Sequence, residues 1–295
     1  MNGTNDTLKT EKKTMVILGS GQFGRAAAAL INASHYSLIA YGDNNSSLHG
    51  TFIAGTPVVS VEDAVALNPD CVLIGVTDKV RSDELRHQAA ACGFNGNFLL
   101  LGELHELIDI RKGVICRLAE RLRALQTDGN IAELGVYKGE LAAVLNALFP
   151  EKTIYLFDTF TGFDARDIDI ESDSDYSHAK AGDFSDTGET AVLNKLPFPE
   201  KAIIRKGFFP DTARGLENEL YAFVSLDADL YAPTLAGLEY FYPRLNKGGV
   251  IILHDYNNSR FSGVKHAVED YEQKHGALAL VPLCDLHGSA VIVKQ

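Results

Sequence analysis

Short apolar runs alternate with longer helix-like stretches along almost the whole chain, and this alternation restricts the fold more than any other feature. Residues 14–18, 36–41, 71–76 and 97–101 predict buried strands, and the stretches between them predict helices. A strand followed repeatedly by a helix requires a parallel sheet with helices on both faces. The sequence therefore predicts a small doubly wound α/β domain at residues 14–103.

A second series of the same kind occupies residues 129–295 and differs at its end. Its predicted strands and helices alternate up to a helix at 263–275, and two further strands, 279–283 and 290–294, follow with only a short loop between them. A short loop between strands is typical of an antiparallel hairpin. We expect two doubly wound, Rossmann-like domains, the second closed by an antiparallel hairpin. The remaining predicted elements are strands at 131–134, 153–157, 202–206, 221–226 and 250–253, and helices at 140–149 and 234–245.

The two series are joined by residues 104–128, where apolar residues recur at a spacing of three and four. This spacing predicts a connecting helix whose apolar stripe packs on the second domain. The first residues, 1–13, form a polar tail without the apolar core of a signal peptide. No apolar run reaches the roughly 18 residues of a membrane span, so we expect a cytoplasmic protein without a membrane partner.

The composition excludes some classes of partner and leaves others open. The net charge of −12 argues against nucleic acid or an anionic membrane as the main partner, and solubility alone explains such a charge. The four cysteines lie far apart, which fits a reducing compartment better than a disulfide framework. A small-molecule or glycan substrate is the expected partner, and a homo-oligomer remains open.

A glycine-containing turn follows the first strand of the second domain. The segment from Glu133 to Gly139 has an acidic residue and two glycines, Gly135 and Gly139, and glycines let a backbone approach a ligand closely. Asp158 follows the next strand, where a carboxylate can accept the ribose hydroxyls of an adenosine. The motif is also compatible with a plain turn, but with Asp158 it predicts a nucleoside-binding site.

Two further strands of this domain end in acidic residues, Asp227 and Asp255. Parallel strands open on one crevice at their carboxyl ends, and carboxylates that converge there repel one another unless a cation or a proton intervenes. Oxygen ligands with an open side suit Mg²⁺, which would acidify an acceptor hydroxyl for a nearby base. The alternative is that both aspartates only cap helices or turns.

Five sequence blocks in this order resemble the macrocin O-methyltransferase family, from about Leu118 to the C-terminus. The blocks are "AELGVYKGELAAVLNAL", "IYLFDTFTGF", "AGDFSDT", "VSLDADLYAPTLAGLEYFYPRL" and "GGVIILHDYNN". The resemblance implies a class I methyltransferase fold and transfer of a methyl group from S-adenosylmethionine to a hydroxyl of a sugar or similar compound.

The resemblance also implies roles for residues of this chain. Glu133, Gly135 and Gly139 would contact the methionine end of the cofactor, Asp158 its ribose, and Asp183 and Phe184 would lie near the adenine. Asp227 would be a metal ligand and candidate base, and Asp255 a second ligand.

One position departs from the family pattern, because His254 replaces the first of two expected aspartates. An imidazole can ligate a metal, but it suits Mn²⁺, Zn²⁺ or Fe²⁺ better than Mg²⁺. Alternatively, His254 is the base of a metal-free site.

An acidic stretch at residues 159–186 separates two of the predicted elements. It is compatible with a solvated, disordered loop or with a lid over the site that brings His178 to it.

The first domain carries its own glycine motif: Gly19, Gly21 and Gly24 follow a predicted strand, and Asp43 follows the next one. This matches the dinucleotide fingerprint in form. The segment "GTPVVSVEDAVALNPDCVLIGVTD" resembles small Rossmann-like domains that precede sugar-modifying enzymes. The resemblance implies that the domain binds a nucleotide or nucleotide sugar; a purely structural role is the alternative.

Two other functions remain open at this point. One is an NAD(P)-linked oxidoreductase that uses the first glycine motif, and the other is a non-catalytic nucleotide-binding regulatory protein.

Overall fold

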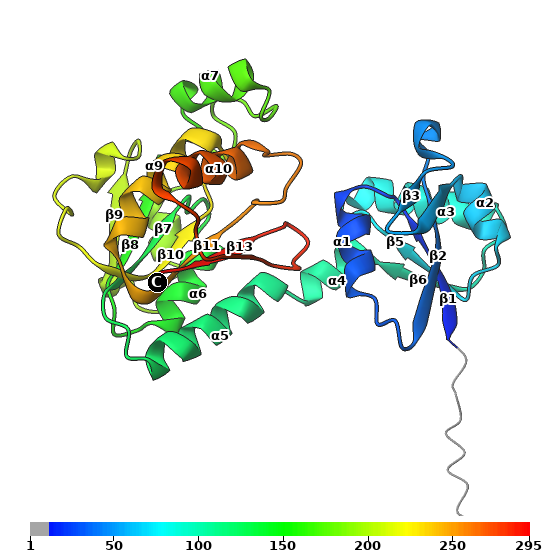
Figure 1. The fold of residues 1–295 in the computed structure, drawn as a ribbon, viewed down its shortest axis with the longest axis horizontal. Coiled ribbons are helices and arrows are strands. Elements are labelled where there is room, and N and C mark those ends of the chain that lie inside the picture. The colour runs from blue at the N-terminus through cyan, green and yellow to red at the C-terminus, as the bar shows by residue number, and fades with distance from the viewer. Residues whose placement is uncertain (1–11) are drawn as a thin grey trace, which may run out of the picture. The chain divides into compact units, whose positions relative to one another are not determined.

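The computed structural model describes residues 12–295, and the chain divides into two compact units, residues 1–109 (unit 1) and 110–295 (unit 2) (Figure 1). The polar tail predicted at residues 1–13 lies outside the described residues except for Lys12 and Lys13. Over the described part of the chain, no helix combines the length and the apolar character needed to cross a membrane.

Unit 1 is a doubly wound α/β unit with the sheet order β3-β4-β2-β1-β5-β6. All its strand pairs are parallel except that of β3 with β4, and β3 was not predicted. Its strands are β1 (Lys13–Leu18), β2 (Tyr36–Gly42), β3 (Phe52–Ile53), β4 (Thr56–Val59), β5 (Cys71–Ile74) and β6 (Asn97–Leu100). Its helices are α1 (Gln22–Leu30), α2 (Val61–Ala66), α3 (Lys79–Ala91) and α4 (Leu101–Leu107), with a short 3₁₀ turn at Ser46–Leu48.

Two helices of unit 1, α2 and α3, begin at a residue whose side chain caps them. The Ser60 side chain accepts a hydrogen bond from the amide of Asp63 at the start of α2, and Asp78 does the same for Arg81 at the start of α3. Helix α1 covers one face of the sheet, and α2 and α3 cover the other (Figure 1).

Unit 2 has a seven-stranded sheet in the order β12-β13-β11-β10-β7-β8-β9. Strand β13 runs antiparallel to both β11 and β12, so the predicted closing hairpin is confirmed. The strands are β7 (Asn130–Leu134), β8 (Ile154–Asp158), β9 (Ala202–Lys206), β10 (Tyr221–Leu226), β11 (Leu245–Leu253), β12 (Leu280–Pro282) and β13 (Ala290–Val293). The helices are α5 (Ile110–Ala124), α6 (Glu140–Leu148), α7 (Ala165–Ser174), α8 (Glu189–Leu193), α9 (Tyr231–Arg244) and α10 (Gly263–His275), with 3₁₀ turns at Pro199–Lys201 and Asp211–Ala213.

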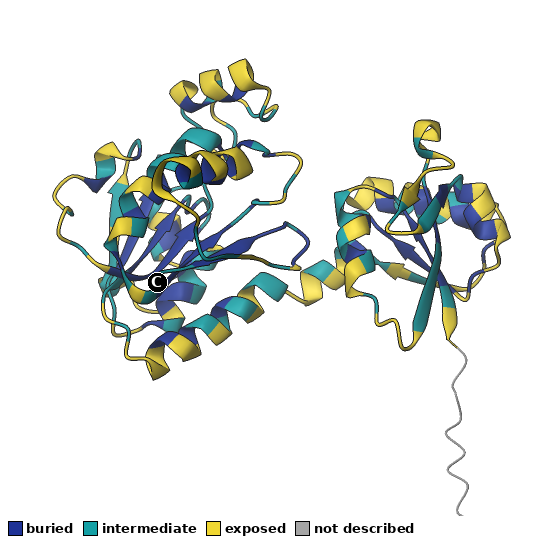
Figure 2. Cartoon of the chain, in the orientation of Figure 1, coloured by how far each residue is buried: buried dark blue, intermediate teal, exposed yellow. Residues whose placement is uncertain are grey.

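Two apolar layers cover the sheet of unit 2, one on each face. Residues of α9 and α10 form one layer with inward-facing strand residues, and residues of α5, α6 and α8 form the other. The five inner strands are buried over most of their length, the edge strands β9 and β12 are not, and the outer faces of the helices are exposed (Figure 2). The inner strands therefore carry polar side chains mainly at their ends.

The connecting helix predicted at 104–128 is interrupted, because helix α4 ends at Leu107 and α5 begins at Ile110. The apolar stripe of α5 packs on unit 2 as predicted, with Ile115, Ala119 and Leu122 buried. The earlier part of the expected stripe is exposed instead, with Leu107 at 79% and Ile108 at 59%.

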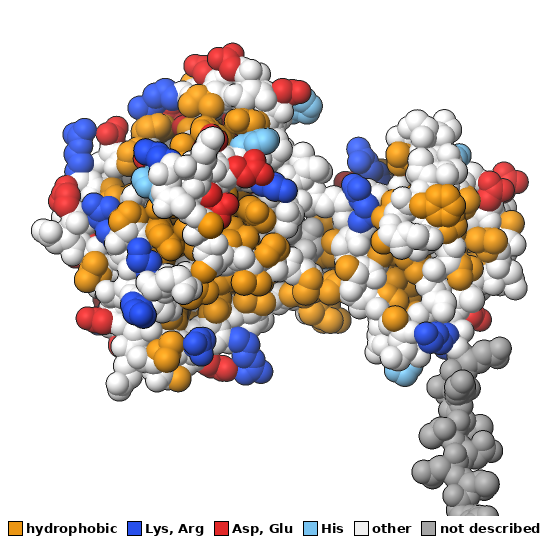
Figure 3. Space-filling model, in the orientation of Figure 1, with side chains coloured by type: hydrophobic (Ala, Val, Ile, Leu, Met, Phe, Trp, Pro, Cys, Tyr) orange, Lys and Arg blue, Asp and Glu red, His pale blue; other side chains and the backbone are white. Residues whose placement is uncertain are grey.

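The acidic stretch at 159–186 contains the ordered helix α7. Its N-cap, Asp164, accepts a hydrogen bond from the amide of Arg166, and Asp167 and Glu171 are buried on its inner face. The Glu171 carboxylate accepts a hydrogen bond of 2.7 Å from the amide of Tyr231, the first residue of α9. The outer face of α7 carries exposed acidic side chains (Figure 3), which explains why the composition alone is compatible with a solvated loop.

Candidate functional site

The glycine turn of unit 2 connects β7 to α6. Gly135 has a φ of +88°, and a Cβ atom built there would lie 2.0 Å from the carbonyl oxygen of Asp227. Gly139 has a φ of +79° and packs against the side chain of Val192. The sequence predicts these glycines as points where a ligand approaches. The structure gives another reason for a glycine at both positions, because atoms of the chain itself lie where a side chain would be.

Asp158 fastens this turn to the end of β8. One carboxylate oxygen accepts hydrogen bonds from the amides of Val136 (2.8 Å) and Tyr137 (2.9 Å), and the other accepts one of 2.6 Å from Phe160. A carboxylate has about four acceptor positions, so these bonds leave little capacity for a ribose without some exchange of partners. The predicted position of Asp158 beside the turn is correct, and its contact with a ribose stays a prediction.

Asp227, which follows β10, meets two basic side chains. Its Oδ1 lies 2.8 Å from Nδ1 of His254, and its Oδ2 accepts a hydrogen bond of 2.8 Å from Nη1 of Arg111, near the start of α5. The hydrogen bond from the Asp227 amide to the carbonyl of Leu134 and that from the His254 amide to the carbonyl of Leu226 align the ends of β7, β10 and β11.

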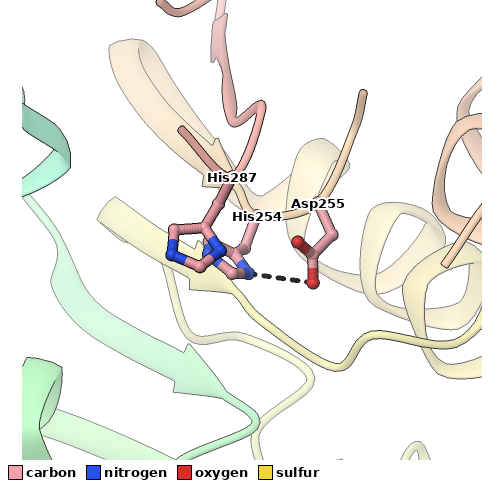
Figure 4. A group of neighbouring side chains, drawn as sticks. All are labelled: His254, Asp255 and His287. Atoms are coloured by element: carbon pink, nitrogen blue, oxygen red, sulfur yellow. Dashed lines mark ion pairs between the residues drawn. The ribbon is translucent and has the colours of Figure 1, made fainter. Parts of the chain in front are cut away.

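Asp255 approaches the same nitrogen of His254. Its Oδ2 lies 3.1 Å from Nδ1 of His254, and its Oδ1 accepts a hydrogen bond of 2.6 Å from the Asn258 amide group (Figure 4). Asp255 is 2% exposed. Asp229 joins the cluster, and both Asp229 and Asp255 have left-handed backbones, with φ of 60° and 57°. Such backbone conformations are uncommon outside glycine and often mark functional sites.

These residues fit a divalent cation. Nδ1 of His254 is closed to water and close to two carboxylate oxygens, yet neither contact has the geometry of a hydrogen bond. Two ligands bound at right angles about 2.1 Å from a metal lie about 3.0 Å apart, which matches the spacing of these atoms. Asp227, Asp229, His254 and Asp255 offer ligand atoms within 4.8 Å of one another.

Each carboxylate thus directs one oxygen toward His254 and has the other held by a donor. Arg111 holds Asp227 and Asn258 holds Asp255. Outer partners of this kind orient the ligands of metal sites.

Burial and neighbouring charges perturb the pKa values of these groups in opposite directions. Burial raises the pKa of Glu133 well above its ordinary value, and the carboxylate of Asp227 raises it further. Burial also opposes ionisation of Asp227, but the cationic His254 and Arg111 outweigh it and hold the pKa of Asp227 well below its ordinary value. For His254, burial is outweighed by Asp227 and Asp255, which raise its pKa to about 10. Without a cation, an ionised Asp227 therefore faces a protonated His254.

Aromatic side chains lie beside the glycine turn. Phe184 makes edge contacts with Tyr137 (ring centroids 5.3 Å apart) and Phe163 (5.2 Å), and it is 37% exposed. Asp183, its neighbour, accepts a hydrogen bond from the amide of Lys180. The structure thus brings Phe184 to the turn, whereas His178, considered for a lid, is exposed.

The glycine motif of unit 1 is packed mainly against itself. A Cβ atom on Gly24 would lie 2.0 Å from the carbonyl oxygen of Gly19, whereas one on Gly21 would meet nothing within 4 Å. One oxygen of Asp43 accepts hydrogen bonds from the amide (2.8 Å) and hydroxyl (2.5 Å) of Ser20, and the other accepts one from the amide of Asn45 (2.9 Å). Asp43 therefore fastens the turn, as Asp158 does in unit 2.

The comparison with protein families decides the relationship of unit 2. The family described as Macrocin-O-methyltransferase (TylF) matches residues 111–294, more than half of the chain. The chain belongs to this family. The resemblance stated from the sequence blocks is thereby confirmed for unit 2.

Family relatives are similar at modest identity. The chain is 26% identical over 161 residues to the Mycinamicin III 3''-O-methyltransferase of Micromonospora griseorubida, which covers 50% of this chain and 62% of that protein. It is 26% identical over 176 residues to the 8-demethyl-8-(2,3-dimethoxy-alpha-L-rhamnosyl)-tetracenomycin-C 4'-O-methyltransferase of Streptomyces olivaceus, which covers 55% and 64%. The chain spans a little under two-thirds of the length of these curated relatives.

Solved structures share the fold. The O-methyltransferase NovP has a TM-score of 0.52 at 21% identity, covering 63% of this chain and 79% of that one. The calicheamicin methyltransferase CalS11 has a TM-score of 0.52 at 22% identity, covering 73% and 86%. These likenesses establish an α/β methyltransferase fold.

The sequence patterns did not identify three residues of the candidate site. Arg111 was assigned to the connecting helix, Asp229 was quoted within a family block without a role, and Asn258 was not considered. The spacing of Asp229 two residues after Asp227 was the one available signal. Arg111 gave none, because only the fold brings it to a residue 116 positions later in the chain.

Proposed function

We propose that the chain is an S-adenosylmethionine-dependent O-methyltransferase that methylates a hydroxyl of a sugar or related polyhydroxyl compound, assisted by a divalent cation. The observation that carries the proposal is the cluster of Asp227, His254 and Asp255 at adjacent strand ends, inside the region that matches the family. Acidic groups at this edge of a doubly wound sheet lie where such folds bind their ligands.

Glu133 is the residue whose surroundings call most clearly for a cationic ligand. Its side chain is 1% exposed, and its Oε2 has no hydrogen-bond partner among the described residues. A buried polar atom without a partner is rare and costly. The ammonium group of S-adenosylmethionine could donate a hydrogen bond to it, in agreement with the predicted contact with the methionine end of the cofactor.

The ribose and the adenine of the cofactor would then lie next to the glycine turn. Asp158 lies beside it, and exchange of one of its amide partners would free an acceptor for a ribose hydroxyl. Phe184, Tyr137 and Phe163 offer an apolar surface next to Asp183 for the adenine.

A divalent cation held by Asp227, His254 and Asp255 would lower the pKa of the acceptor hydroxyl and orient it. Asp227 is the candidate base, because the neighbouring positive charges keep the pKa of its carboxyl group low and the group ionised. Arg111 keeps the Asp227 carboxylate ionised and fixes its rotation. Methyl transfer is an in-line displacement, so holding the acceptor oxygen in line with the sulfonium provides much of the rate enhancement.

The names of the relatives support a sugar acceptor. The Streptomyces olivaceus relative is named as a 4'-O-methyltransferase of a rhamnosyl-bearing tetracenomycin. By analogy, the acceptor proposed for this chain is a hydroxyl on a free, nucleotide-linked or product-linked sugar.

Unit 1 is proposed as a non-catalytic module, residues 14–103, that binds a nucleotide or nucleotide sugar and positions it for the methyltransferase domain at 129–295. The support is Gly21, the N-cap of α1, which has open space beside it, because the N-terminus of a helix attracts a phosphate group.

Binding and turnover test the proposal together. The purified protein is titrated with S-adenosylhomocysteine by calorimetry and then assayed with labelled S-adenosylmethionine against sugars, nucleotide sugars and glycosylated products. We expect micromolar binding, and we expect Asp227→Asn to lower turnover by a factor on the order of 10²–10³ while affinity for S-adenosylhomocysteine changes little.

Asp175→Asn is the matched control, since Asp175 is an exposed aspartate at the end of α7 whose left-handed backbone asparagine tolerates. It should leave both quantities unchanged. A protein that does not bind S-adenosylhomocysteine, or an Asp227→Asn variant with full turnover, would refute the proposal.

A further inference from the structure

A histidine on the terminal hairpin lies next to the candidate cation site. His287 belongs to the loop between β12 and β13, and its ring centroid lies 5.2 Å from that of His254, with the two rings tilted by 34° (Figure 4). His254, Asp255 and His287 each offer a ligand atom, and these atoms lie within 4.8 Å of one another. Neither the sequence blocks nor the proposed function assigns a role to His287.

Hydrogen bonds hold the loop that carries His287 in place. The buried carboxylate of Asp285 accepts hydrogen bonds of 2.8 Å from both the amide and the hydroxyl of Ser289. The carbonyl of Gly288 accepts a hydrogen bond of 2.8 Å from the amide of Asn257, two residues after Asp255. The backbone on either side of His287 is thus tied to itself and to the segment that carries Asp255, so the imidazole is held beside the cluster.

We propose that His287 is a further protein ligand of the cation and that this second imidazole selects a transition metal, such as Mn²⁺, Fe²⁺, Co²⁺ or Zn²⁺, over Mg²⁺. The inference rests on the proposed function, because it concerns the cation of that same site. It adds a second imidazole beside His254 and Asp255, and the class of metal.

Ligand chemistry supports this selection. Mg²⁺ binds oxygen ligands and retains water, whereas an imidazole suits transition metals, and two imidazoles with carboxylates form a set that such metals occupy. Coordination needs a neutral imidazole, so binding of the metal should weaken as the pH is lowered.

Metal affinity gives the first test. The full-length protein, stripped with a chelator, is titrated by calorimetry with Mn²⁺, Co²⁺ and Mg²⁺. We expect Mn²⁺ and Co²⁺ to bind at least about tenfold more tightly than Mg²⁺, and we expect His287→Ala to weaken Co²⁺ binding at least about tenfold. His254→Asp, which restores an acidic pair, should move the preference back toward Mg²⁺.

The number of histidine ligands gives a second, direct test. In the proton NMR spectrum of the Co²⁺-loaded protein, each coordinated histidine contributes a strongly shifted, exchangeable ring N–H signal. We expect two such signals in the parent protein and one in His287→Ala. His275→Ala removes a histidine on α10 that lies outside the cluster, and it should retain both signals and the parent affinity.

The outcomes separate this inference from the proposed function. A single shifted signal in the parent protein, or equal Co²⁺ affinity in the parent and His287→Ala, would overturn the role of His287 even if methyl transfer is observed. Two signals in a protein that fails to bind S-adenosylhomocysteine would support the metal site and refute the methyltransferase assignment.

Discussion

The two glycine turns of this chain are built alike and end in different surroundings. In each unit, an aspartate at the end of the second strand stabilises the turn: Asp43 in unit 1 and Asp158 in unit 2. One carboxylate oxygen accepts hydrogen bonds from amides of the turn, and the other accepts one from the amide two residues later in the chain. The strand that corresponds to β10 is β5 of unit 1, and it leads into Gly75, which packs against Gly19. In unit 2 the same position carries Asp227.

The comparison separates the scaffold from the chemistry. The glycines and the fastening aspartate hold a strand–turn–helix junction together in both units, and they do so whether or not a reactive group lies nearby. Side chains at the neighbouring strand ends are what distinguish a candidate catalytic site from a turn. Asp227, His254 and Asp255 supply them in unit 2.

The largest expected effect concerns the glycines. Gly135→Ala combines a φ of +88° with a contact of 2.0 Å to the Asp227 backbone, so we expect it to destabilise unit 2 by roughly 3 kcal/mol or more. Gly21→Ala, in open space with an ordinary φ of −67°, should cost less than about 1 kcal/mol. Urea unfolding followed by circular dichroism measures both, and equal losses would remove the distinction between a packed and an open glycine.

The fastening aspartates provide the next test. If Asp158 also grips a ribose, Asp158→Ala should weaken S-adenosylhomocysteine binding about 100-fold, equivalent to about 2.7 kcal/mol. Asp43→Ala leaves the amides of Ser20 and Asn45 unpaired and should lower the stability of unit 1 by about 1–3 kcal/mol, with no change in that affinity. Calorimetric titration of both variants decides the question. Unchanged affinity in Asp158→Ala would show that Asp158 stabilises the turn and does not bind the ribose.

The smallest expected effect depends on pH. The buried carboxyl side chains among the described residues all lie in unit 2: Glu133, Asp167, Glu171, Asp255 and Asp285. Burial, with the nearby charge of Asp164, raises the pKa of Asp167 to about 6. The protonated form is therefore favoured by folding, and the stability it contributes is full below the ordinary value of 3.8 and is lost as the pH rises through about 6.

Asp167→Asn removes the ionisation, so the variant should be more stable than the parent by about 1–3 kcal/mol at pH 8 and nearly equal to it at pH 4. Urea unfolding at the two pH values measures the difference. Asp173→Asn, on the exposed face of the same helix, is the control and should change stability at neither pH.

The strands of unit 2 were largely predictable, because continuous apolar runs such as 221–226 and 250–253 are typical of strands buried on both faces of a parallel sheet. The short loop at 284–289 predicted the hairpin. Helix α7 was not predictable, since it is held in place by the hydrogen bond from the Tyr231 amide to Glu171, and its acidic composition is equally typical of a loop. The interruption of the connecting helix after Leu107 was not predicted, because the spacing of apolar residues does not show which of them are buried against the rest of the protein.

The site was predictable where its residues end strands. Asp227, His254 and Asp255 follow β10 and β11 directly, and parallel topology brings such positions together. Arg111 and His287 lie on a helix and a hairpin loop, and their approach depends on how those elements pack. Their proximity to the cluster could therefore not be predicted from the sequence.

The antiparallel position of β13 has a consequence during synthesis. Residues 254–289 separate β11 from β13, and a ribosome needs about 2–7 s to add these 36 residues at 5–20 residues per second. Until β13 has been made, one edge of β11 lacks its partner strand, and an open strand edge of this kind promotes aggregation. Pairing with residues 290–293 closes that edge, so the terminal hairpin protects the sheet as well as completing it.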